Sequence, residues 1–207
     1  MSLWGDAHAA STNKPKFLPQ DENSDYNRAD CYATQAGWVM QAGHPSSGNS
    51  NTAATPEVLV ASGGLAGATD TTGLRAPTVT SMRFVKGTTA TTDLTAVDST
   101  GRIRVEITWD EEVTVAGTPQ VVVANSNASG GGFGNYTLSY ISSGSTANRK
   151  LFEATSQSLG NTDVLTLGGA NITLNSGTIS DTVRGGTSQA ASLVLSGLSA
   201  VAVTIAS

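Results

Sequence analysis

Residues 101–109 read GRIRVEITW, and this stretch carries the clearest structural signal in the chain. Apolar and polar side chains alternate along it, and the apolar set is Ile103, Val105, Ile107 and Trp109. Alternation with a period of two is typical of a β-strand that buries one face and exposes the other. We therefore predict a half-buried strand here, with Trp109 in the core.

Several shorter runs after residue 77 have the same strand character. They are 78–85, 112–115, 120–124, 136–141, 150–154, 164–167, 171–174, 178–179 and 192–205. Turn-forming residues separate them, such as Gly-Thr-Pro at 117–119 and Gly-Gly at 168–169. Many short strands without a helical pattern predict an antiparallel sandwich or barrel, and no substantial helix in this part of the chain.

The composition of the 207-residue chain limits the functional classes. Its 11 basic and 16 acidic residues leave a net charge of −5. A negative chain repels phosphate, which argues against nucleic acid as a partner. The late apolar stretch LVLSGLSAVAVTIAS is broken by Ser and Gly and is shorter than the roughly 20 apolar residues of a membrane span. No membrane partner is therefore expected.

The first 61 residues follow a different pattern. They contain both histidines and the single cysteine, but almost no periodicity outside 32–41 and 57–61. Because so few aliphatic residues cannot readily bury a core, we predict an extended irregular arm that orders on a partner surface. A flexible tail with incidental aromatics is the alternative. Residues 62–77, SGGLAGATDTTGLRAP, have the composition of a linker, which leaves residues 78–207 for the sandwich.

Aromatic and basic residues of the arm are the candidates for docking on a partner. An aromatic side chain that enters a pocket can bury about 150–250 Å². A lysine can pair with an acidic surface or remain solvated. The predicted docking residues are Trp4, Lys14, Lys16, Phe17, Tyr32 and Trp38.

The N-terminal sequence MSLWGDAHAASTNKPKFLPQ lacks the apolar run of a secretory signal peptide. The single cysteine, Cys31, cannot form an internal disulfide. We expect synthesis in a cytoplasm, without a signal peptide, and a fold held by packing and hydrogen bonds.

Three later segments carry a family resemblance. They are 107–123 (ITWDEEVTVAGTPQVVV), 135–140 (NYTLSY) and 165–181 (LTLGGANITLNSGTISD). These resemble the bacterial immunoglobulin-like repeats of surface and virion proteins, in which an aromatic residue, an acidic pair and Val precede a Gly-Thr-Pro turn. The chain departs from that pattern at Glu112, where Pro is common, and at Ser176, where Gly is common. The resemblance implies that residues 78–207 form an immunoglobulin-like antiparallel β-sandwich.

The N-terminal segment carries a second resemblance. MSLWG at 1–5, NKPKF at 13–17, GWV at 37–39 and EVLVA at 57–61 are similar to the opening of structural proteins from contractile-tailed marine phages of the cyanophage type. In that group the opening is joined to immunoglobulin-like domains. This resemblance implies a virion component made in the cytoplasm of the host cell.

Catalytic and metal-binding chemistry is expected to be absent. Cys31, His44 and Asp30 are the nominal partners of a thiol nucleophile, but they lie in the least regular segment. A zinc site from Cys31, His8 and His44 lacks a fourth ligand. The acidic run Asp110, Glu111 and Glu112 is a weak candidate for calcium, and otherwise forms a polar turn that keeps a strand end solvated. We expect neither an enzyme nor a bound cofactor.

Together the resemblances imply a non-enzymatic capsid decoration protein on the virion surface. Its arm would bind the major capsid protein, and its immunoglobulin-like domain would be displayed outward. A tail, neck or baseplate component is an alternative. Another is an adhesin that binds a host-surface glycan through loops 125–134 and 142–150, with Phe133 and Asn148 as exposed loop contacts.

Overall fold

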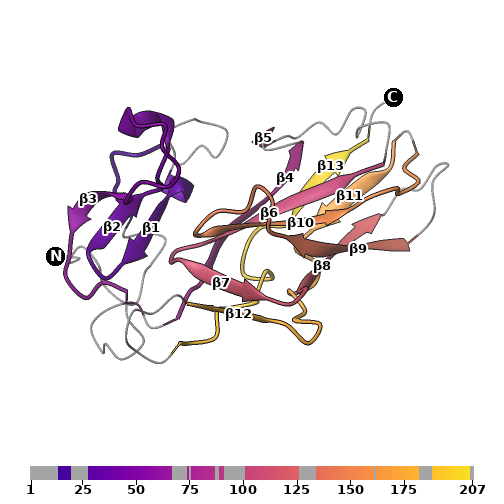
Figure 1. The fold of residues 1–207 in the computed structure, drawn as a ribbon. Helices are drawn as coiled ribbons and strands as arrows, with labels where there is room; N and C mark the ends of the chain where they lie inside the picture. Colours follow the sequence, from indigo (N-terminus) through magenta and orange to yellow (C-terminus); the bar gives the residue numbers. More distant parts are fainter. Residues whose placement is uncertain are drawn as a thin grey trace. The chain divides into compact units, whose positions relative to one another are not determined.

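The fold is described from a computed structural model (Figure 1). It describes residues 14–19, 28–66, 74, 76–86, 89–90, 101–125, 134–160, 162–181 and 188–205. The chain divides into two compact units. The first unit comprises Met1–Thr80, Thr108–Val115 and Ile179–Ser192; the second comprises Ser81–Ile107, Ala116–Thr178 and Leu193–Ser207. Each unit is described separately below.

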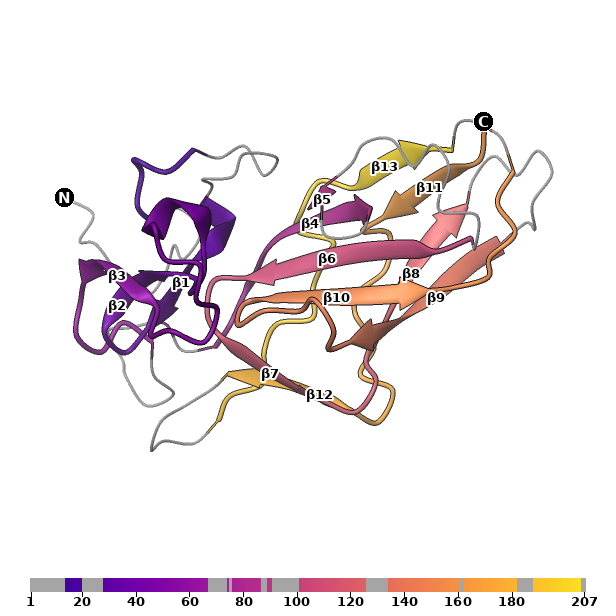
Figure 2. The same ribbon diagram turned by 45° about the horizontal axis from the view of Figure 1, so that its top comes forward.

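The main sheet has eight strands, and most of its residues belong to the second unit. Its strand order is β13 (Val201–Thr204), β11 (Val164–Leu167), β8 (Gln120–Asn125), β9 (Gly134–Ile141), β10 (Arg149–Ala154), β6 (Ile103–Trp109), β4 (Val79–Lys86) and β5 (Thr89–Ala90). The pairs β8–β9, β9–β10, β8–β11 and β11–β13 are antiparallel. Figures 1 and 2 show that the sheet is strongly curved. The predicted mainly β, sandwich-like fold is confirmed.

The core of the second unit follows the predicted alternation. In β8, Val121 and Val123 are fully buried while their neighbours are partly exposed, and Leu165 and Leu167 repeat this in β11. Burying each such side chain contributes about 1.5–3 kcal/mol relative to leaving it exposed. Ile103, Val105 and Ile107 of β6 are also completely buried in this unit. Trp109, at the end of β6, belongs to the first unit and is completely buried, which confirms it as a core residue.

The opposite face of β6 differs from the expected solvent-exposed face. Glu106 is only 7% exposed, and its Oε1 accepts a hydrogen bond of 2.9 Å from Nε of Arg83. Arg149 lies 3.7 Å from the same oxygen, and Arg104 on β6 pairs with Glu153. Because β6 lies between β10 and β4, these neighbouring strands supply oppositely charged partners that make burial of the polar face tolerable.

Most predicted strands are present within one or two residues of their expected ends. Two predictions were wrong. Residues 171–174 form only an isolated bridge at Thr173, and of 192–205 only β13 is a strand. These two segments are joined by single hydrogen bonds: the Ile172 amide donates to the Leu193 carbonyl oxygen, and the Leu195 amide donates to Asn171 Oδ1. Beyond residue 77, the described segments contain no helix, as predicted.

The first unit contains a three-stranded antiparallel sheet, β1 (Cys31–Thr34), β2 (Gly37–Met40) and β3 (Glu57–Ala61). The 3₁₀ turn η1 (Arg28–Asp30) precedes β1, and the 3₁₀ turn η2 (Pro45–Ser47) follows β2. Gly37 has a φ of +128°, and an added Cβ there would lie 2.0 Å from Val60 O, so only glycine fits. The two regular segments predicted within the first 61 residues are the strands of this sheet.

A small hydrophobic cluster lies within the first unit. Its buried members are Leu18, Cys31, Ala33, Trp38, Met40, Leu65 and Leu74. The sequence predicted that the first 61 residues lack a core, and the structure differs because Leu65 and Leu74 come from the segment of linker composition. Part of the predicted irregular arm is thus folded on itself.

A third sheet has two strands and pairs β7 (Val113–Ala116) with β12 (Thr178–Asp181). The acidic residues Glu111 and Asp181 lie just before β7 and at the end of β12. In the part of the chain that the structure describes, no helix is long and apolar enough to cross a membrane.

Candidate functional site

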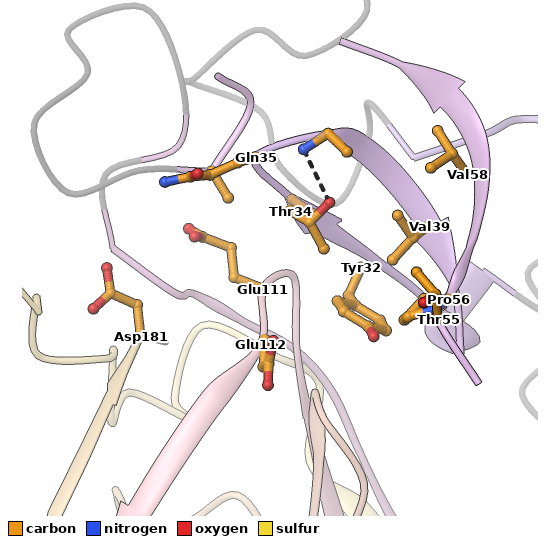
Figure 3. Close-up of a pocket in the computed structure, with 13 residues that line it drawn as sticks. Tyr32, Thr34, Gln35, Val39, Thr55, Pro56, Val58, Glu111, Glu112 and Asp181 are labelled. Carbon is orange, nitrogen blue, oxygen red and sulfur yellow. Dashed lines mark hydrogen bonds between the residues drawn. The ribbon is translucent and has the colours of Figure 1, made fainter. Parts of the chain in front are cut away.

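The candidate site is a cavity of about 420 Å³ whose lining residues all belong to the first unit. This volume falls in the range of small-ligand sites, about 300–1,000 Å³. Strands β1 and β2 and the turn between them line one part of it, and the acidic residues Glu111, Glu112 and Asp181 line another (Figure 3). The cavity therefore combines an apolar wall with a group of carboxylates.

Backbone hydrogen bonds hold the acidic segment against β1. The Ala33 amide donates to the Asp110 carbonyl oxygen at 2.7 Å, and Ala33 and Glu111 form a parallel bridge. The Asp110 amide donates to the carbonyl oxygen of Thr78 at 3.1 Å. Glu111 is thus placed in the cavity by paired backbone rather than by an open loop.

Asp110 itself is a structural residue. It is completely buried, and its two carboxylate oxygens accept hydrogen bonds from the Thr78 amide (2.7 Å) and the Thr78 hydroxyl (2.6 Å). Burial raises the pKa of Asp110, while the bonds from Thr78 and the positive charge of Lys14 oppose that rise.

Glu111 is in a less favourable environment. It is 3% exposed, and its Oε1 has no hydrogen-bond partner among the described residues. Burial raises the pKa of Glu111 to about 8, and the negative charges of Asp110 and Asp181 contribute to the rise. A buried polar atom without a partner costs about 1–3 kcal/mol, so its presence needs an explanation.

Two other acidic residues complete this end of the cavity. Asp181 is 5% exposed, and its Oδ1 accepts hydrogen bonds from the Gln189 amide (2.6 Å) and the Ser188 hydroxyl (3.0 Å). Glu112 is partly exposed. Burial, followed by the charges of Glu112 and Cys31, raises the pKa of Tyr32 in the cavity wall to about 12.

The calcium and solvated-turn interpretations of Asp110, Glu111 and Glu112 both need correction. Asp110 and Glu111 are buried, so they do not keep a strand end solvated. Among the residues that the structure describes, no group of three or more His, Cys, Asp or Glu side chains is arranged to hold a metal ion. The Asp110 oxygens are instead bonded to Thr78.

The predicted docking residues fall into two groups. Tyr32, Trp38 and Lys14 are 3%, 0% and 2% exposed, so they pack inside the chain instead of projecting toward a partner. This corrects the docking role predicted for them, because the first unit buries its own aromatic side chains. Trp4 lies outside the described residues.

Lys16 and Phe17 are exposed, and Phe17 is 69% exposed, the highest value among the large apolar residues described. Hydrogen bonds hold the turn formed by residues 15–18. The buried Leu18 donates its amide to Pro15 O at 3.2 Å, and Arg28 donates from Nε to Leu18 O (2.9 Å) and from Nη2 to Lys16 O (3.0 Å). This role of Arg28 has no local sequence signal, because its two contacts join residues ten and twelve positions apart.

Of the two predicted loop contacts, the structure describes only Asn148. Asn148 is completely buried, which corrects its assignment as an exposed contact. The loop folds back on itself, since the Ser145 hydroxyl bonds Ile141 O and also accepts the Leu151 amide. Phe133 lies outside the described residues.

The nominal thiol site is only partly assembled. His44 Nε2 lies 3.0 Å from Asp30 Oδ2, and both side chains are buried. Cys31 is a completely buried thiol in the hydrophobic cluster, and burial raises its pKa to about 12. A thiol with this pKa is not a nucleophile near neutral pH. His8 lies outside the described residues.

No family model, no curated protein and no solved structure matches this chain.

Proposed function

We propose that this chain is a non-enzymatic structural protein of a phage virion, a capsid decoration protein that attaches through its N-terminal segment and displays its β-sheet unit. The observation that carries the proposal is the exposed Phe17 on the turn braced by Arg28. The resemblance of the N-terminal segments to marine phage structural proteins supports the same assignment.

The geometry of this turn suits docking. Arg28 holds the backbone on both sides of Phe17, so less backbone has to be ordered on binding and more of the burial energy of Phe17 contributes to affinity. Lys16 beside it adds a positive charge for an acidic partner surface. Many copies on a symmetric lattice would turn a modest affinity at each site into stable attachment.

Particle composition tests the proposal. Purified particles carrying the wild-type chain should contain it in many copies by quantitative mass spectrometry. The Phe17→Ala chain should be lost from them or strip off under milder conditions. Val194→Ala is the matched control, because Val194 is 50% exposed in the second unit and should not affect attachment. Absence of the wild-type chain from particles would exclude a virion role, and full retention of Phe17→Ala would exclude this docking residue.

Copy number also separates the positions within a virion. A high copy number fits a capsid or tail lattice, and a low one fits the neck, baseplate or a fibre. Antibody labelling of intact particles would then distinguish the capsid surface from the tail.

A further inference from the structure

We propose that the cavity of the first unit binds a primary ammonium group, carried by a lysine side chain or by a free alkylamine, and that the Glu111 carboxylate receives it. This site goes beyond the proposed docking role of Phe17. Neither Phe17 nor Lys16 lines the cavity, so the two proposals can fail separately.

The first support is the state of Glu111. Its side chain lines the cavity and is 3% exposed, yet Oε1 has no hydrogen-bond partner among the described residues. Figure 3 shows this side chain extending from the 110–112 segment toward the turn that carries Gln35. Backbone hydrogen bonds between Asp110 and both Ala33 and Thr78 fix the position of this segment, so the Glu111 side chain starts from a fixed point beside the cavity. A ligand that donates a hydrogen bond would satisfy Oε1.

The second support is the charge around it. The charges of Asp110 and Asp181 both act on Glu111, and Glu112 lines the same cavity. Tyr32 is the other titratable group of the wall. This grouping repels anions and favours a cation. The described residues provide no metal-binding group of three, so the favoured ligand is an organic cation.

The shape of the wall favours an ammonium on an alkyl chain. Tyr32, Val39 and Val58 supply apolar surface that can cover a methylene stem. An ammonium is a compact charge whose three donors can face carboxylates from different directions. A guanidinium instead needs a planar pair of acceptors, and Asp181 Oδ1 already accepts from Ser188 and Gln189.

Proton linkage provides a distinctive signature of this site. Because burial and acidic neighbours raise the pKa of Glu111 to about 8, its carboxyl is mainly protonated at pH 7. A bound ammonium stabilises the ionised carboxylate, so binding at pH 7 releases protons. Affinity should therefore increase as the pH rises toward 8, and decrease near pH 10 to 10.5, where an alkylamine loses its own proton.

Calorimetric titration of the full chain at pH 8 tests the site with three probes. Butylamine supplies the free amine, Nα-acetyl-lysine amide supplies the lysine side chain, and Nα-acetyl-norleucine amide is the uncharged control. Glu111→Gln should weaken binding of the amines by about tenfold or more. Glu57→Gln removes the same charge from an exposed residue of the first unit outside the cavity and should leave binding unchanged.

Saturable binding of either amine that depends on Glu111 supports the proposal. Binding of the lysine derivative alone identifies a protein side chain as the source, and equal binding of both shows that the ammonium and a short stem suffice. No saturable binding by the wild type, binding of the norleucine control with equal affinity, or equal affinity of the Glu111→Gln and Glu57→Gln chains would overturn it.

Proton release provides a measurement that needs no variant. Titrations of the wild type at pH 7 in buffers of different ionisation enthalpy should report release of a fraction of one proton per bound amine. Binding without proton release would contradict the role of Glu111 even if a variant failed to fold.

Discussion

Two buried glutamates, five positions apart in the chain, have opposite environments. Glu106 in the second unit is 7% exposed and lies against the guanidinium groups of Arg83 and Arg149. Glu111 in the first unit is 3% exposed, and the negative charges of Asp110 and Asp181 act on it. Burial alone therefore does not define a functional site. Removing a compensated carboxylate leaves buried guanidinium groups unpaired, whereas an uncompensated carboxylate in a cavity is available to a ligand.

The largest expected effect comes from removing the compensated charge. Glu106→Gln should lower the free energy of unfolding by about 3–5 kcal/mol, because Arg83 and Arg149 would lose their shared carboxylate in a poorly hydrated position. Glu111→Gln should be neutral or slightly stabilising. Urea denaturation of the Glu106→Gln and Glu111→Gln chains at pH 7 measures both effects. A larger loss in Glu111→Gln than in Glu106→Gln would reverse the comparison.

An intermediate effect is expected at Asp110, whose charge is compensated by hydrogen bonds from Thr78. Thr78→Val keeps the shape of the side chain and the backbone bond but removes the 2.6 Å bond from the hydroxyl to Asp110 Oδ2. A hydrogen bond to a charged group contributes about 1.5–3 kcal/mol, so stability should fall by that amount. Thr137→Val, at an exposed position of β9, is the control. Equal stability of both variants would show that the Thr78 hydroxyl does not support Asp110.

The dependence of stability on pH is small per pH unit and comes from Glu111. The pKa of Glu111 is raised from 4.5 to about 8 in the folded chain. Between these values the folded state holds a proton that the unfolded state has lost, so stability decreases as the pH rises through this window. The slope from this residue is at most about 1.4 kcal/mol per pH unit.

Denaturation from pH 5 to pH 8 measures this slope in the wild type and in Glu111→Gln. The variant should show a flatter profile, because glutamine does not titrate. Parallel profiles would mean that Glu111 does not carry the pH dependence. Glu57→Gln should keep the wild-type slope.

Much of the second unit could be predicted from sequence because strand periodicity is a local property. The alternation in 101–109 identified β6 and the burial of Ile103, Val105 and Ile107, and the Val and Leu patterns identified β8 and β11. The first unit was harder. Leu65 and Leu74 lie in the segment of linker-like composition, far along the chain from β1, so their place in its core has no local signal.

The candidate site was also only partly predictable, because its contacts join residues far apart in the sequence. The acidic run Asp110, Glu111 and Glu112 was recognised from sequence, but its exposure was predicted wrongly. Neighbours along the chain do not reveal that Thr78 bonds Asp110 or that Asp181 lies near Glu111. These contacts join residues 32 and 70 positions apart.

The sequence by itself determined a mainly β chain with a negative charge, a strongly alternating strand at 101–109 and two regions of different composition. Those properties follow from local side-chain periodicity and from counting residues. Only the tertiary structure decided which charges are compensated. Arginines from β4 and β10 form ion pairs with Glu106, whereas the negative charges of other carboxylates act on Glu111. It also decided that Trp38 is buried and Phe17 exposed, since burial depends on what the rest of the chain packs against each side chain.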